Sequence, residues 1–77
     1  MKLSNNDVIT MIAQLRPDVA MDKSDVDVAF KIIGVDSLDI MSVLHTIQQQ
    51  TGVEVPDDEI GELDTVAKIT NYINAQI

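Results

Sequence analysis

The chain contains no cysteine and no tryptophan, and its 77 residues include one phenylalanine and one tyrosine. Without cysteine, neither a disulfide framework nor a thiolate metal site is available. No apolar run approaches the roughly 20 residues of a membrane-spanning helix, and the N-terminal segment MKLSNND does not have the pattern of a signal peptide. We therefore expect one small domain over residues 1–77, located in the cytoplasm, with no membrane insertion and no large enclosed active site.

Basic residues are also scarce. Five Lys and Arg stand against 13 Asp and Glu, which gives a formal net charge of −8. No Lys or Arg occurs between Lys31 and Lys68, whereas eight acidic residues fall in that interval. Binding to nucleic acid needs cationic side chains that displace counterions, so the composition argues against a nucleic-acid partner. The acidic interval is either a solubilising surface or a docking face for basic partners.

Hydrophobic periodicity predicts a first helix over residues 5–15. Its cap is Asn5 or Asn6, and its inward face comprises Val8, Ile12 and Leu15. A loop over residues 16–36 follows, which is too long to be featureless in so small a domain. We expect five apolar residues to hold this loop against the core: Val26, Val28, Phe30, Ile32 and Ile33.

The segment GVDSLDIMSVL, residues 34–44, opens a second helix that covers residues 37–51. Asp36 is its expected N-cap, Asp39 adds negative charge near the positive end of the helix dipole, and Gly52 ends the helix. The inward stripe comprises Ile40, Val43, Leu44 and Ile47.

A third long helix is predicted within TVAKITNYINAQI, residues 65–77, capped by Asp64 or Thr65. Its inward residues are Val66, Ile69, Tyr72 and Ile73. The preceding segment DDEIGEL reads as one or two turns capped by Asp57, with Ile60 and Leu63 inward. The predicted fold is therefore all-α, a small antiparallel bundle of three long helices and one short one.

Ser37, between two aspartates, raises the question of catalysis. A serine nucleophile needs a base within hydrogen-bond reach, but the single histidine, His45, lies eight residues along the same helix, roughly 12 Å away. The segment lacks the G-x-S-x-G elbow of hydrolases, and the acidic segments DVDVAF and PDDEIGE do not keep the ligand spacing of an EF-hand loop. We expect no catalytic residue and no metal site, and we interpret His45 as a surface residue without a chemical role.

A serine can also serve as a point of attachment. At the first position of a helix, the hydroxyl of Ser37 would point outward at the rim of the bundle, where the helix N-terminus tolerates an added phosphate. A partner enzyme could then activate the hydroxyl, and the surrounding acids would steer that basic partner toward it.

GVDSLD resembles the attachment motif of acyl carrier proteins, Leu-Gly-x-Asp-Ser-Leu. VEVPDDEI resembles the segment after that family's second helix, and TVAKITNYI resembles its last helix, so the resemblance covers essentially the whole chain. It implies that Ser37 carries 4′-phosphopantetheine, transferred from coenzyme A by a separate phosphopantetheinyl transferase that uses Mg²⁺. The terminal thiol of that group would hold acyl groups as thioesters, so the chain would be a carrier and not an enzyme.

We expect a docking surface beside Ser37, composed of Asp36, Leu38, Asp39 and Met41. Leu38 and Met41 lie on a different face from the inward stripe, although Met41 could instead belong to the edge of the core. The expected partners are the transferase and acyl-loading, ketosynthase-type or acyltransferase enzymes with basic docking faces. We expect the chain itself to be a monomer.

Several residues depart from the pattern of carriers in primary fatty acid synthesis. Ser42 and the glutamines at 48–50 stand where those carriers usually have glutamate, Ile32 replaces an aspartate, and Thr51 stands where an aromatic residue is frequent. These changes favour a carrier dedicated to a specialised lipid, polyketide or aryl-polyene pathway. An aminoacyl or peptidyl carrier is an alternative, although the aspartate before Ser37 favours an acyl carrier. An unmodified acidic interaction module is the alternative from a different class.

Overall fold

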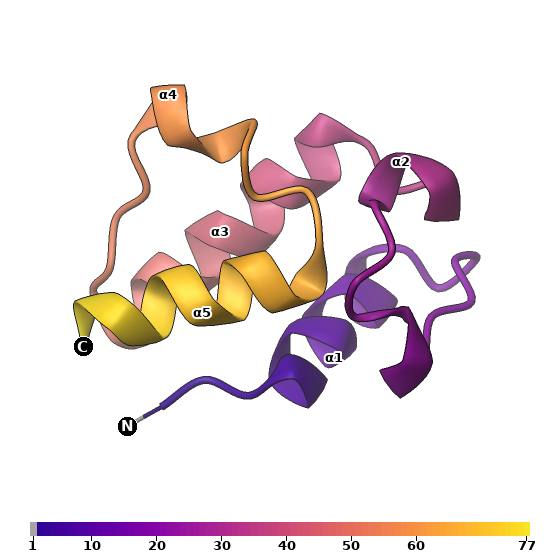
Figure 1. Cartoon of the computed structure of the whole chain (residues 1–77), viewed down its shortest axis with the longest axis horizontal. Helices are drawn as coiled ribbons and strands as arrows, with labels where there is room; N and C mark the ends of the chain where they lie inside the picture. The colour runs from indigo at the N-terminus through magenta and orange to yellow at the C-terminus, as the bar shows by residue number, and fades with distance from the viewer. Residues whose placement is uncertain (1) are drawn as a thin grey trace.

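The computed structural model describes residues 2–77 (Figure 1). In chain order the elements are α1 (Asn5–Leu15), a 3₁₀ turn η1 (Lys23–Asp25), α2 (Phe30–Ile33), α3 (Ser37–Thr51), α4 (Asp57–Ile60) and α5 (Val66–Gln76). Residues 2–77 contain no strand, so the all-α prediction is confirmed. The structure has one short helix more than predicted, because α2 forms inside the segment expected to be a loop.

The caps explain where the helices begin. The Ser4 hydroxyl accepts from the Asp7 N–H at 3.1 Å, and the Asp7 carboxylate accepts from the Ser4 N–H at 2.9 Å. This capping box starts α1, so the prediction of Asn5 or Asn6 as the cap was wrong. Thr65 caps α5 by accepting from the Lys68 N–H at 3.1 Å, as one of the two predicted alternatives.

The start of α4 also differs from the prediction. Pro56 occupies the capping position with an extended backbone, and no side chain caps this helix. Asp57 was expected to be the cap but lies inside the first turn, where its charge faces the positive end of the helix dipole without capping it.

The core forms where α1 packs against both α3 and α5. Its most buried members come from all three long helices and from α2: Val8, Ile12, Phe30, Ile47, Val66, Ile69 and Ile73. Two backbone hydrogen bonds fasten the first long connection to the region of α5. The Phe30 N–H donates to the Asp64 carbonyl at 2.8 Å, and the Ala67 N–H donates to the Val26 carbonyl at 2.9 Å.

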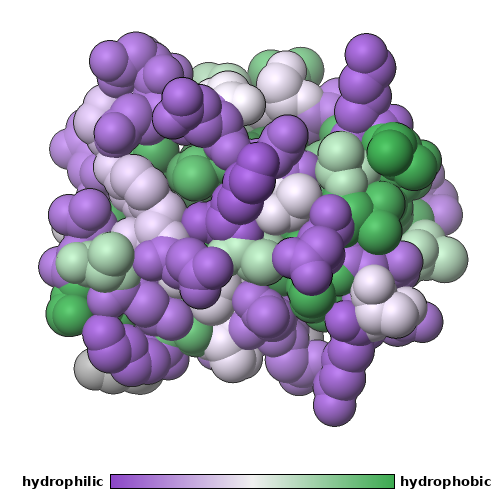
Figure 2. Space-filling view, viewed as in Figure 1, coloured by the Kyte–Doolittle hydropathy of each residue, from purple (hydrophilic) through white to green (hydrophobic). Residues whose placement is uncertain are grey.

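Two apolar residues expected in the core are exposed instead. Ile32 is 78% exposed, because successive helical residues are about 100° apart and the burial of Phe30 turns Ile32 away from the core. Leu15 is exposed at the last turn of α1, whereas Ile9 in the first half of that helix is buried. Figure 2 shows apolar side chains gathered at the end of the molecule where α2 lies.

The two ends of the described chain are fastened to each other. The side-chain amide of Asn74 accepts from the Leu3 N–H and donates to the Leu3 carbonyl, both at 2.8 Å. Figure 1 places these ends at the opposite end of the long axis from α2 and the start of α3. Across residues 2–77, no helix has the length and apolar character to cross a membrane.

Candidate functional site

Ser37 is the first residue of α3 and is exposed. Asp36 precedes it as the N-cap, and its Oδ1 accepts from the Asp39 N–H at 3.0 Å. In return, Oδ2 of Asp39 accepts from the Asp36 N–H at 3.2 Å. The predicted cap is therefore confirmed, and this reciprocal capping box leaves the Ser37 hydroxyl unused at the rim of the bundle.

A sharp reversal of the chain places Ser37 beside α2. Gly34 ends α2 in the left-handed conformation, with φ of 102°, and its N–H donates to the Phe30 carbonyl at 2.9 Å. A Cβ atom at Gly34 would meet no atom within 4 Å, so the backbone conformation alone requires glycine here. Residues of α2 and of the start of α3 therefore line the same groove.

An open groove of about 400 Å³ lies beside the serine. Phe30 and Ile40 contribute apolar walls, and Ser37 lies at its edge. Of the described residues that line the groove, Lys31 is the only cation. The carboxylates of Asp36 and Asp64 also line it. That of Asp64 is paired with Lys68 at 2.8 Å, and this pairing lowers the pKa of Asp64 below its usual value.

This combination fits an arm attached through a phosphate. The N-terminus of a long helix favours negative charge on the attached group. The ammonium group of Lys31 supplies the opposite charge among the lining residues, and the apolar walls suit the less polar part of an arm. The single histidine lies away from Ser37, because His45 is exposed and its ring nitrogen lies 3.3 Å from the Gln49 amide, within the same helix.

The predicted docking residues are not equivalent. Leu38 is 72% exposed and Met41 is 48% exposed, three residues apart on the outer face of α3. Asp36 is exposed as well. Asp39 differs, because only 15% of its side chain is exposed and its Oδ2 lies 2.6 Å from Nη1 of Arg16. No local sequence pattern connects Arg16 to this site, because 23 residues separate it from Asp39.

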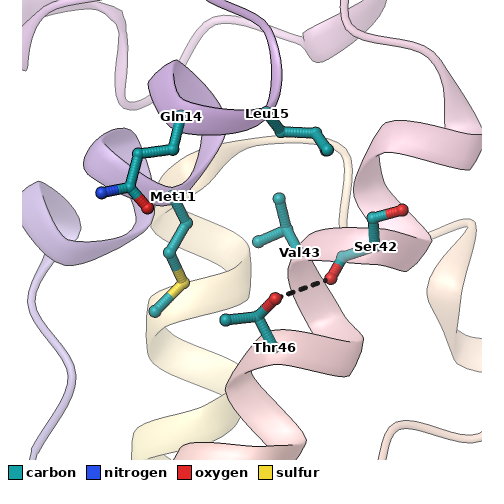
Figure 3. A pocket seen from close by; sticks show the side chains of 6 residues that line it. All are labelled: Met11, Gln14, Leu15, Ser42, Val43 and Thr46. Carbon is teal, nitrogen blue, oxygen red and sulfur yellow. Dashed lines mark hydrogen bonds between the residues drawn. The ribbon is translucent and has the colours of Figure 1, made fainter.

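A second cavity, of about 210 Å³, lies between α1 and α3 (Figure 3). Met11 and Leu15 reach into it from α1, and Val43 faces them from α3. On its α3 side, the Thr46 hydroxyl donates to the Ser42 carbonyl at 3.2 Å. The α3 side of this cavity carries no charged side chain, since Ser42, Val43 and Thr46 line it.

Comparison with known proteins identifies the family of the chain. A family model described as "Phosphopantetheine attachment site" matches residues 7–73. The acyl carrier protein of Tropheryma whipplei (strain Twist) is 35% identical over an alignment of 79 positions, which covers 97% of this chain and 96% of that protein.

Two solved structures are also similar over nearly the whole chain. Butyryl acyl carrier protein of the actinorhodin polyketide synthase from Streptomyces coelicolor superposes with a TM-score of 0.85 at 25% identity, covering 99% of this chain and 92% of that one. The holo form of the actinorhodin carrier has a TM-score of 0.84 at 26% identity, covering 97% and 91%. With an exposed serine at the start of α3 and matches of this extent, the chain belongs to the acyl carrier proteins, the carriers whose prosthetic group is 4′-phosphopantetheine.

Proposed function

We propose that Ser37 is the attachment point of 4′-phosphopantetheine and that the 77 residues act as one monomeric carrier domain. The observation that supports this most strongly is the exposed hydroxyl at the first position of α3, beside the groove and outside the capping box. When bound, the group supplies a terminal thiol that holds an acyl intermediate as a thioester. The chain performs no bond chemistry of its own in this proposal, because no side chain is placed to activate Ser37.

The residues around Ser37 hold the attached group and receive partner enzymes. The first-turn N–H groups of α3 and the ammonium of Lys31 offset the charge of the phosphodiester. Leu38 and Met41 offer apolar contact to a partner, with Asp36 and Asp39 beside them. The partners are a phosphopantetheinyl transferase and acyl-loading, ketosynthase-type or acyltransferase enzymes with basic docking faces.

We propose that the chain serves a pathway that makes a polyketide or another specialised lipid. The butyryl acyl carrier protein named above is described as coming from the actinorhodin polyketide synthase. In addition, the single acidic residue of α3 is Asp39 in its first turn, so docking cannot depend on a row of carboxylates along this helix. A partner enzyme of this chain therefore binds mainly at the start of α3.

The attachment site is tested by intact mass spectrometry. The purified chain is incubated with coenzyme A, Mg²⁺ and a broad-specificity phosphopantetheinyl transferase, next to Ser37→Ala and Ser42→Ala. Ser42 is a matched control, since it is also an exposed serine on α3 but bonds to the Leu38 carbonyl at 3.1 Å. We expect the mass of one phosphopantetheine on the parent and on Ser42→Ala, and none on Ser37→Ala.

The other outcomes are equally informative. A full gain of mass on Ser37→Ala would place the attachment elsewhere in the chain. No gain on the parent with several transferases would contradict the modification itself and would favour an unmodified acidic interaction module.

A further inference from the structure

The carboxylates of Asp36 and Asp39, on either side of Ser37, differ in exposure and in their ionic partners. Asp36 is exposed, and its carboxylate takes part in the capping box. Asp39 forms the same capping box but also pairs with Arg16, whose Nη1 lies 2.6 Å from its Oδ2. The two side chains of that pair are 29% and 15% exposed, so Arg16 covers much of the charge that Asp39 would otherwise present.

Arg16 is itself held in place from its other side. Nε and Nη2 of Arg16 donate to the two carboxylate oxygens of Asp18, at 3.0 and 2.9 Å. Such a two-point contact fixes the plane of the guanidinium. Asp18 and Asp39 together raise the pKa of Arg16 further above its already high usual value, so it stays charged at any working pH. Arg16 directly follows α1 as its C-cap residue, and the ion pair therefore joins the end of α1 to the start of α3.

We propose that Arg16 is a specificity-determining residue that masks Asp39 from partner enzymes. This inference rests on the proposed function, in which partners dock at the start of α3. A cation of the partner must displace Arg16 before it can pair with Asp39, and an intramolecular competitor acts at a high effective concentration. The chain therefore selects partners that bind Asp36 and the apolar side chains of Leu38 and Met41, and penalises partners that need both carboxylates.

The test compares Arg16→Gln with a matched control, Lys23→Gln. Each removes one positive charge, but Lys23 lies in η1 and is exposed. The readout is the KM of the chain as substrate of the phosphopantetheinyl transferase. It is measured at several concentrations from about 20 mM to about 200 mM NaCl, a range over which the Debye length falls. We expect Arg16→Gln to lower KM about threefold, with kcat unchanged and a steeper dependence on salt, because a freed carboxylate strengthens steering. Lys23→Gln should change KM clearly less.

A double-mutant cycle with Asp39→Asn shows whether Arg16 acts through Asp39. The gain from Arg16→Gln should disappear in the Asp39→Asn background. A gain that persists there, or an equal gain in Lys23→Gln, would reduce the effect to net charge and overturn the inference. Unchanged KM in Arg16→Gln, with a parent that is still modified, would overturn it while leaving the proposed function intact.

Folding and function are separated in the same experiment. Arg16→Met keeps the apolar stem of the side chain and replaces Arg16→Gln if the latter loses its helical circular dichroism. Loss of the fold in both variants would assign Arg16 a purely structural role and overturn the inference. A parent chain that no transferase modifies would contradict the proposed function, and the masking role with it.

Discussion

Asp36 combines two physical roles in one side chain. Its carboxylate caps α3 through the Asp39 N–H, and its charge lies next to the exposed hydroxyl of Ser37. Capping needs only an oxygen that accepts a hydrogen bond, whereas the proposed docking of a basic partner needs the negative charge. Substitutions that keep the acceptor and remove the charge can therefore separate the stability of the helix from docking.

We expect Asp36→Ala to lower the free energy of unfolding by about 1 kcal/mol, because alanine cannot cap the helix. Asp36→Asn should stay close to the parent, since asparagine and aspartate cap about equally well. Urea denaturation measures both. An equal loss in the two variants would show that charge at the helix terminus, rather than the capping hydrogen bond, stabilises α3.

A side-chain hydrogen bond joins the short element α4 to α5. The Tyr72 hydroxyl on α5 donates to a carboxylate oxygen of Glu59 on α4. Ionisation of the phenol would break the hydrogen bond to Glu59, so this bond raises the pKa of Tyr72 above 10.0, its ordinary value, and desolvation and the negative charge of Glu59 act in the same direction. Because the folded pKa is raised, this contact stabilises the fold below the unfolded pKa and loses its contribution as pH rises through the folded pKa.

Tyr72 is the only tyrosine of the chain, so its titration can be followed directly by phenolate absorbance. We expect a midpoint above 10.0 in the parent and a lower midpoint in Glu59→Gln, which removes the charge but keeps an acceptor. The same midpoint in both proteins would show that the charge of Glu59 does not contribute to the raised pKa of Tyr72.

The long helices could be predicted from the sequence because each carries several signs that agree. In α3, the helix period, an aspartate before the first turn and a glycine after the last one give the bounds found in the structure. The four residues of α2 could not be predicted in this way, since one turn is too short to show a period. Ile32 and Leu15 were placed wrongly for a related reason, because burial at the end of a helix depends on tertiary packing.

The site was predictable only in its local part. The capping chemistry of one segment indicates Asp36 as the N-cap and Ser37 as the first residue of a helix, and the structure has both there. The pairing of Arg16 with Asp39 joins residues 23 positions apart, and nothing local indicates it. The groove beside Ser37 likewise needs residues from three segments of the chain, including Asp64.

The whole molecule carries its net charge of −8 in a small volume, with dimensions of 29 × 25 × 19 Å. At about 0.01 M salt the Debye length is roughly 30 Å, which is comparable to the size of the molecule, so all of its charges interact with one another. At about 0.15 M it is roughly 8 Å, and only neighbours interact. Self-repulsion of the acidic surface therefore opposes folding mainly at low salt.

Raising NaCl from about 0.01 M to about 0.15 M should increase Tm by about 4–8 °C, the shift that corresponds to roughly 1 kcal/mol in a domain of this size. The few ion pairs weaken over the same range, but exposed pairs contribute little. Differential scanning calorimetry at constant pH measures the shift. A Tm that falls with salt would show that attraction between specific pairs outweighs the repulsion of the whole surface.

The contact between Asn74 and Leu3 has a practical consequence for tethering. Since it brings both ends of the described chain together, away from the start of α3, a polypeptide fused to either end would emerge on the side remote from Ser37. A surface anchor or fluorescent fusion could be installed there without obstructing the serine. The two ends could also be joined by a short linker and the chain reopened elsewhere, which would turn the carrier into a circular permutant.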